Sequence, residues 1–172
     1  MDSTEARRVR NKKTRRLAVG GLMAALIAAL TAYVRISIPG GYLNPGDAAV
    51  AMAGVLLGPY AAIPAAVGSG LADLLGYPQY AIFTFIIKGC MGLIVGWGCK
   101  SGKLNLKSLL SLLAADVVLV GGYFLTDLLL GDIGMSVADL PWNALQAAIL
   151  LVAGIACLVT GLKRVMQKIG EA

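Results

Sequence analysis

Apolar segments alternate with short polar segments along the whole of this 172-residue chain. Most of the apolar segments approach the roughly 20 residues that a straight membrane crossing needs. Charges and turn-forming residues divide them into six predicted helices, which cover Leu17–Val34, Asp47–Leu57, Pro59–Gly76, Gln79–Trp97, Leu109–Leu130 and Pro141–Leu162. The pattern therefore predicts an all-α membrane protein with six transmembrane helices.

The connection Arg35–Gly46 is rich in proline and glycine and is predicted to lack regular helix. Asp47 follows it and is predicted to cap the second helix, and Gly58-Pro59 is predicted to turn the chain into the third. The second helix is short, so the segment Asp47–Gly76 could instead form one kinked membrane span. Six crossings place every basic cluster on one side of the membrane, whereas five would place one cluster outside.

Thirteen of the fifteen basic residues fall in three clusters: seven in Arg7–Arg16, three in Lys100–Lys107 and three in Lys163–Lys168. Lysine and arginine concentrate in the cytoplasmic parts of membrane proteins. The clusters predict a multi-pass protein of the cell membrane with both termini in the cytoplasm. The predicted organisation is a basic cytoplasmic segment at residues 1–16, a six-helix transmembrane domain at residues 17–162 and a basic cytoplasmic tail at residues 163–172.

The composition excludes several functional classes. The chain is 58% hydrophobic and 14% charged, with a mean hydropathy of +0.80, which is far from the balance of a soluble domain. The net charge of +6 belongs mostly to the topological clusters, so nucleic acid is not an expected partner, whereas anionic lipid headgroups are. The chain has no histidine, and its three cysteines lack metal-ligand spacing, so we expect no metal, no cofactor and no enzymatic activity.

Small residues form a stripe along the first predicted helix. Such stripes let helix backbones approach closely in lipid, where packing replaces the hydrophobic drive. Internal packing and docking to a separate membrane subunit are both open readings of the stripe. Its members are Gly20, Ala24, Ala25, Ala28, Ala29 and Ala32.

Ionisable and polar residues inside the predicted spans gather toward the outer half of the membrane. Buried charges in a bilayer need a partner or an aqueous cavity, and the pattern predicts an ion pair between Asp73 and Lys88, which lie on adjacent helices. Asp116, Tyr123 and Asp127 share one helix face. The convergence predicts a pocket for a small polar ring compound beneath the glycine-rich loop Ile38–Gly46. The candidate substrate-binding residues are Asn44, Asp47, Tyr80, Thr84, Lys88, Tyr123, Asn143 and Gln146.

Three segments together resemble a known family of membrane proteins. They read GY-x-N-x-GD from Gly41, LADLL-x-Y-x-x-Y from Leu71 and TFIIKG from Thr84, and "GGYFLTDLLL" and "LPWNALQ" follow later in the chain. They resemble the substrate-binding S component of energy-coupling-factor (ECF) vitamin transporters, in the branch that includes hydroxymethylpyrimidine- and riboflavin-type S components. The resemblance covers nearly the whole chain.

The resemblance implies a subunit that captures a vitamin outside the cell and associates with a membrane coupling (T) subunit and two cytoplasmic ATPase subunits. It also implies that the small-residue stripe docks on the coupling subunit. The chain has no GxxxxGK[ST] motif, so ATP hydrolysis is expected from the partners. The expected substrate is hydroxymethylpyrimidine or a vitamin B6 form, because few aromatic residues suit one small ring better than a flavin.

Two other functions remain open from the residues alone. A solitary transporter driven by protons or sodium would use Asp116 and Asp127 as coupling groups. A membrane scaffold or assembly factor would bind no small molecule.

Overall fold

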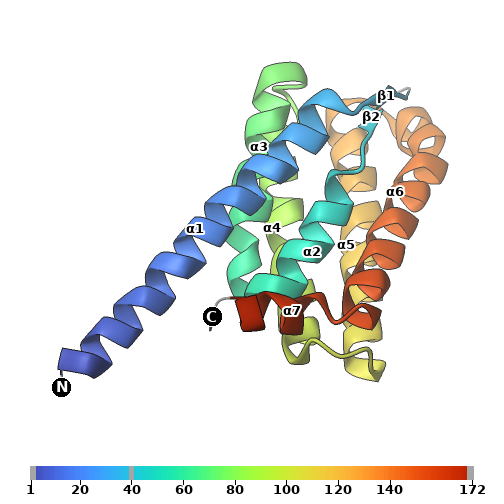
Figure 1. Cartoon of the computed structure of the whole chain (residues 1–172). Coiled ribbons are helices and arrows are strands. Elements are labelled where there is room, and N and C mark those ends of the chain that lie inside the picture. Colours follow the sequence, from blue (N-terminus) through green and yellow to red (C-terminus); the bar gives the residue numbers. More distant parts are fainter. Residues whose placement is uncertain (1–2, 39–40, 170–172) are drawn as a thin grey trace.

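The computed structural model describes residues 3–38 and 41–169 and is about 86% helical, which confirms the all-α class. The helices form one bundle, with a small β-hairpin at one end and a short helix lying across the other (Figure 1). The elements are α1 (Ser3–Tyr33), β1 (Ile36–Ser37), β2 (Tyr42–Leu43), α2 (Gly46–Leu57), the 3-10 turn η1 (Gly58–Ala61), α3 (Ala62–Gly76), α4 (Ala81–Gly98), η2 (Cys99–Ser101), α5 (Leu106–Leu130), α6 (Ile133–Val159) and α7 (Leu162–Ile169).

The chain reverses direction between α2 and α3. Gly58 has φ +62°, a backbone conformation that favours glycine, and Pro59 follows it in the first turn of η1. As a result α2 and α3 run in opposite directions (Figure 1). By length and composition alone, the described residues contain five candidate membrane spans, because Gly46–Gly76 counts as one segment and includes both helices.

Helix α2 forms the centre of the bundle, because it packs against α1, α4 and α6. Eight of its twelve residues are buried, most of them small, so neighbouring helices come close to its backbone. Larger side chains fill the core around it, including Val50, Met91, Val95, Leu112 and Leu150. A short helix in this position is shielded from lipid by the longer helices around it.

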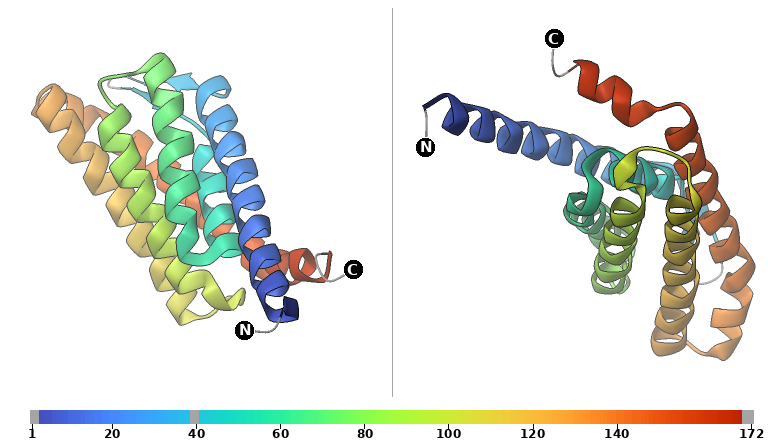
Figure 2. Two further views of the ribbon diagram at one scale, coloured as in Figure 1. Left: turned by 90° about the vertical axis from the view of Figure 1, so that its left-hand side faces the viewer. Right: turned by 90° about the horizontal axis from the view of Figure 1, so that it is seen from below.

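The two ends of the bundle differ in character. The β-hairpin, the turn between α3 and α4 and the turn between α5 and α6 lie at one end (Figure 1). The start of α1, α7, η1 and η2 lie at the other end, where the basic N-terminal part of α1 projects beyond the bundle (Figures 1 and 2). We call these the hairpin end and the basic end.

Two helices begin earlier than the sequence pattern predicted. Helix α1 extends back to Ser3 through the basic segment, because arginine and lysine are good helix formers. Helix α6 begins at Ile133 and not at Pro141, so most of the connection left between the predicted helices Leu109–Leu130 and Pro141–Leu162 is helical. Asp132 caps α6 by accepting from the backbone N–H of Met135 at 2.9 Å, and Pro141 lies inside the helix, as membrane helices tolerate.

Candidate functional site

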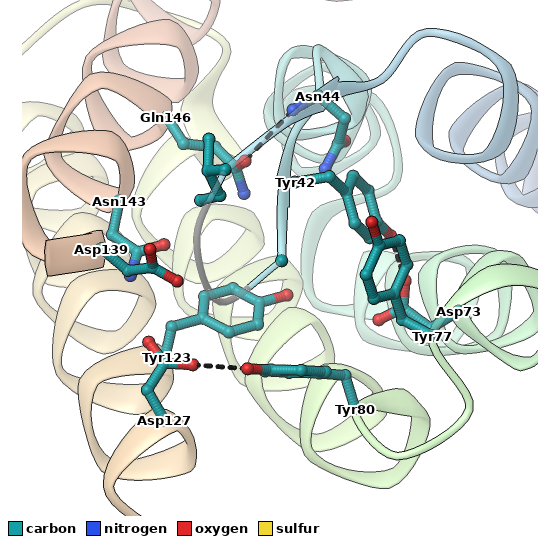
Figure 3. A pocket seen from close by; sticks show the side chains of 12 residues that line it. Tyr42, Asn44, Asp73, Tyr77, Tyr80, Tyr123, Asp127, Asp139, Asn143 and Gln146 are labelled. Atoms are coloured by element: carbon teal, nitrogen blue, oxygen red, sulfur yellow. Dashed lines mark hydrogen bonds between the residues drawn. The ribbon is translucent and has the colours of Figure 1, made fainter. Parts of the chain in front are cut away.

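A polar cavity lies at the hairpin end, enclosed by the hairpin and by the ends of α3, α4, α5 and α6. Its volume is about 30 Å³, which is enough for about two water molecules. Figure 3 shows side chains from all of these elements converging on it. The lining residues are Ile38, Gly41, Tyr42, Asn44, Asp73, Tyr77, Tyr80, Tyr123, Asp127, Asp139, Asn143 and Gln146.

A second cavity of about 320 Å³ adjoins the first and is more open to the surroundings. It shares four lining residues with the inner cavity: Ile38, Gly41, Tyr77 and Tyr80. Gln79, Leu130 and Met135 complete its wall. The two cavities together form an entrance and an inner chamber, and Tyr77 and Tyr80 lie between them. The inner chamber, with room for about two water molecules, is too small for a ring compound unless its walls move apart.

The hairpin is held over the cavity by hydrogen bonds from its second strand and the following turn. The backbone N–H of Asn44 donates to Oε1 of Gln146 in α6, at 3.3 Å. The side-chain oxygen of Asn44 accepts from the backbone N–H of Gly46 at 2.8 Å, which fixes the turn into α2. Asn44 and Gln146 were both predicted from the sequence as site residues, and the structure brings them into contact.

Arg35 stacks against the outer face of the hairpin. Its guanidinium donates to the backbone carbonyls of Thr31 and Ala72, at 2.8 and 2.9 Å, and it lies 4.5 Å from the ring centre of Tyr42. The Tyr42 hydroxyl donates to Asp73. Burial, and then the nearby Asp73 carboxylate, raise the pKa of Tyr42 well above its usual value, so the phenol stays protonated and remains a donor.

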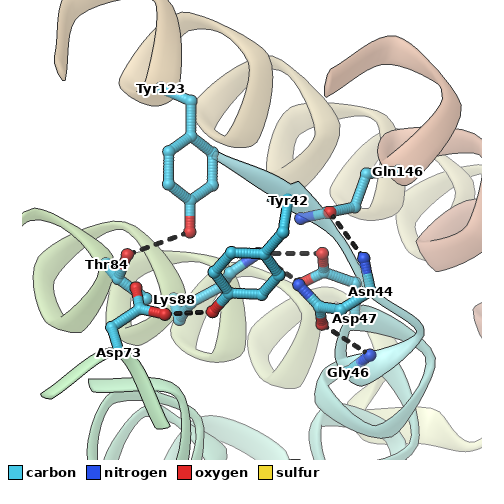
Figure 4. A network of polar contacts seen from close by, with 9 residues as sticks. All are labelled: Tyr42, Asn44, Gly46, Asp47, Asp73, Thr84, Lys88, Tyr123 and Gln146. Atoms are coloured by element: carbon cyan, nitrogen blue, oxygen red, sulfur yellow. Dashed lines mark hydrogen bonds and ion pairs between the residues drawn. The ribbon is translucent and has the colours of Figure 1, made fainter. Parts of the chain in front are cut away.

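Lys88 forms its ion pair with Asp47, which corrects the predicted pair with Asp73. The Lys88 ammonium lies 2.6 and 2.8 Å from the two carboxylate oxygens of Asp47, and both side chains are almost fully buried, at 3% and 0% exposed. Asp47 is not the N-cap of α2. Pro45 occupies that position, and Asp47 lies in the first turn, where its carboxylate reaches α4. Asp73 is instead oriented toward Tyr42 (Figure 4).

Two further contacts join α4 to α5 beside the cavity. The hydroxyls of Thr84 and Tyr123 are 3.1 Å apart, and the Tyr80 hydroxyl donates to Oδ1 of Asp127 at 2.9 Å. The Lys88 ammonium lies 5.1 Å from the ring centre of Tyr123. These contacts connect the cavity wall to the Lys88–Asp47 pair, so the wall and the network beneath it form one continuous polar unit (Figure 4).

Most of the chain matches a known protein family. Residues 11–164 match the family described as ECF-type riboflavin transporter, S component. The chain belongs to this family. A protein of Pyrococcus woesei, described as an "Uncharacterized protein in gap 3'region", is 38% identical over 131 residues, which cover 74% of this chain and 88% of the relative. The resemblance to S components is thereby confirmed, and with it a multi-pass protein of the plasma membrane.

The S component's predicted site residues fall into two groups in the structure. Asn44, Tyr80, Tyr123, Asn143 and Gln146 line the inner cavity. The other three, Asp47, Thr84 and Lys88, are buried in the network beneath it. Lys88 lies eight residues after Tyr80 in the chain, about 12 Å deeper along α4 at roughly 1.5 Å per residue. These three residues therefore support the site instead of lining it.

Sequence reasoning missed several lining residues of the S component. Asp127 could have been assigned, because it lies one helical turn after Tyr123 on the same face of α5. Asp139 precedes Pro141, at which the sequence pattern predicts the start of the last helix, so the pattern gives no helix face for it. Tyr42 and Tyr77 lie in connections without helical periodicity, and Asp73 was assigned to the ion pair. Among the described residues, no group of three His, Cys, Asp or Glu side chains could hold a metal ion.

The small-residue stripe of the S component divides between two environments. Gly20, Ala24, Ala28 and Ala32 are half-buried, and the Ala24 carbonyl packs against Gly68 of α3. The neighbouring positions, Gly21, Ala25 and Ala29, are exposed. An apolar groove of about 460 Å³ runs along the basic half of α1, between this helix, η1 and α3. The stripe thus contributes to internal packing and also leaves a smooth outer surface.

Proposed function

We propose that this S component captures one small, polar ring compound, hydroxymethylpyrimidine or a vitamin B6 form, in the cavity beneath the hairpin. The observation that carries the proposal is an enclosed polar chamber at one end of an otherwise apolar bundle. Tyrosine rings supply stacking surface, and amide and carboxylate groups supply directional hydrogen bonds. A single ring would require less widening of the inner chamber than a flavin would.

We propose six membrane crossings with both termini in the cytoplasm. The chain reversal at Gly58 supports two separate crossings for α2 and α3. Helix α2 is roughly 18 Å long, at about 1.5 Å per residue, and so is shorter than the hydrocarbon core of about 30 Å. Its burial among longer helices makes this length acceptable. All three basic clusters belong to the basic end, which is therefore the cytoplasmic end, and the cavity opens outside.

The family implies a coupling subunit and ATPases as partners, and the exposed small residues of α1 are the proposed docking surface. Ala25 and Ala29 lie one turn apart on the outer face of α1, where a second helix could approach closely. The half-buried positions Gly20, Ala24, Ala28 and Ala32 hold α1 against α3 and set the angle of that surface. The groove lined by Gly20, Gly21 and Ala24 extends the surface toward the basic end.

Replacing both exposed alanines, Ala25→Leu and Ala29→Leu, should abolish vitamin uptake while ligand affinity of the isolated subunit changes by less than about twofold. Leucine would keep a partner helix away from α1 without reaching the cavity at the hairpin end. The matched control is Ala114→Leu, at an exposed position of α5, which should transport normally. Uptake is measured with labelled vitamin in cells that carry the complete transporter. Loss of both binding and uptake would show that Ala25 and Ala29 serve internal packing instead.

Substrate capture is tested first by mass spectrometry of small molecules that copurify with the detergent-solubilised S component. Asn143→Ala should then weaken binding of the identified ligand by about 5- to 100-fold, because an unsatisfied buried partner costs about 1–3 kcal/mol. Leu145→Ala, on the exposed side of α6, is the matched control and should bind as the unaltered protein does. Calorimetry gives both affinities. Equal affinity in the two variants would place the ligand away from α6.

A separate uptake measurement tests the ECF mechanism. Uptake that persists in cells without the ATPase subunits would contradict it.

A further inference from the structure

We infer that the ligand of the inner cavity presents an amino group, charged or neutral, to Oδ2 of Asp127. This inference rests on the proposed function and narrows the substrate to ring compounds that carry an amino group. It follows from an unsatisfied carboxylate oxygen in the cavity wall and from the charges around it.

Asp127 is buried in the cavity wall, with only 2% of its surface exposed. Its Oδ1 accepts from the Tyr80 hydroxyl at 2.9 Å. Its Oδ2 is also buried but has no hydrogen-bond partner among the residues that the structure describes. A buried carboxylate oxygen left without a partner is costly, and a donor on a bound ligand would remove that cost. Hydrogen bonds from cationic donors to carboxylates are among the strongest in proteins.

The charges around the cavity favour the same kind of ligand. Three carboxylates line it, from Asp73, Asp127 and Asp139. The two nearby cations are already engaged and do not line it: Lys88 is held by both oxygens of Asp47, and Arg35 donates to two backbone carbonyls. Among the described residues, the lining of the cavity thus includes carboxylates but no lysine or arginine, which favours a ligand that is cationic or donates hydrogen bonds over an anionic one.

Aromatic and polar side chains meet around Asp127. Tyr80 and Tyr123 lie beside it, from α4 and α5, and Asp139 and Asn143 approach from α6 (Figure 3). The face of a tyrosine ring carries partial negative charge and attracts cations. An amino group placed at Asp127 would leave the other ring substituents near the amides of Asn143 and Gln146, which can donate or accept.

The test compares two amine–hydroxyl pairs of similar shape. One pair is 4-amino-5-hydroxymethyl-2-methylpyrimidine and its 4-hydroxy analogue, and the other is pyridoxamine and pyridoxine. Calorimetry on the purified full-length subunit, stripped of copurified ligand, gives each affinity. We expect the amine to bind at least tenfold more tightly than the hydroxyl compound in one pair or both. Asp127→Asn should reduce that ratio to less than about threefold, because the amide would place an N–H donor where the ligand needs an acceptor.

The matched control is Asp116→Asn. Asp116 lies on the same helix but does not line the cavity, and its Oδ1 is buried without a hydrogen-bond partner among the described residues. This variant should keep the amine preference. The inference is overturned if the unaltered protein binds the hydroxyl compounds, or riboflavin, at least as tightly as the amines. It is also overturned if Asp127→Asn retains the preference. If Asp127→Asn fails to fold, the ratio of amine affinity to hydroxyl-compound affinity in the unaltered protein decides whether the inference holds.

The outcomes distinguish this inference from the proposed function. A subunit that binds a neutral vitamin and still supports ATPase-dependent uptake would retain the proposed function and lose the inference. A subunit that binds none of these compounds, and from which no small molecule copurifies, would lose both. Amine selectivity that disappears in Asp127→Asn but persists in Asp116→Asn would support both.

Discussion

Lys88→Met should lower the free energy of unfolding of this S component by about 3–5 kcal/mol, which is the range for breaking one partner of a buried ion pair. The substitution would leave the Asp47 carboxylate unpaired in a location where its side chain is 0% exposed. It would also remove the cation that lies against the ring of Tyr123. The measurement is thermal or denaturant unfolding in detergent, followed by the fraction of monodisperse protein.

Two variants show whether the effect belongs to the pair. The double change Lys88→Met with Asp47→Leu removes both charges and should be much milder than Lys88→Met alone, because paired charges can often be replaced by apolar residues. Lys163→Met is the matched control. Lys163 donates to the backbone carbonyl of Lys100 at the basic end, so Lys163→Met should lower the free energy of unfolding by less than about 1.5 kcal/mol. Equal losses in Lys88→Met and Lys163→Met would contradict a structural role for the buried pair.

Asp73 provides a separate check on the corrected pairing. It accepts from Tyr42, while Lys88 is held by Asp47, so Asp73 is expected to couple to the hairpin more than to the ion pair. In a double-mutant cycle, Asp73→Asn and Tyr42→Phe should therefore deviate from additivity more than Asp73→Asn and Lys88→Met.

The fold could be predicted from the sequence mainly through its charges and helix breakers. The helical segments follow from long apolar runs, and the turn at Gly58 from its Gly-Pro pair. The ends of α1 and α6 could not be placed, because basic residues continue a helix readily and Pro141 is accommodated inside one. Periodicity shows which residues share a helix face, but tertiary packing determines where each helix begins and ends.

The site illustrates the same division. Tyr80, Tyr123, Asn143 and Gln146 could be assigned because each is a polar residue within an apolar helix near one end. The partner of Lys88 could not be assigned from the sequence. Asp47 and Asp73 both lie near the hairpin end of helices that contact α4, so either could reach Lys88. The choice between them depends on the rotation of α2 and on the position of the hairpin. Neither is encoded in a local pattern.

Helix α4 and the α2–α3 turn pack backbone against backbone at the basic end, and Gly96 makes this close approach possible. Helix α4 passes the α2–α3 turn at this point, and a Cβ atom at Gly96 would overlap the Gly58 carbonyl and approach the Pro59 nitrogen to 2.7 Å. The obstructing atoms are backbone, so they cannot rotate away as a side chain could. Gly58 itself has φ +62°, which limits its adjustment.

Gly96→Ala should therefore destabilise the protein by at least about 3 kcal/mol, at the upper end of the range for overpacking a core. The control is Gly121→Ala in α5, where a Cβ atom would meet nothing within 4 Å. This control should be neutral or stabilising by up to about 1 kcal/mol, because alanine favours helix over glycine. Thermal unfolding in detergent, with ligand affinity measured in parallel, compares the two. A Gly96→Ala variant as stable as Gly121→Ala would mean that α4 and the α2–α3 turn are further apart than the structure shows, and the central position of α2 beneath the cavity would then have to be revised.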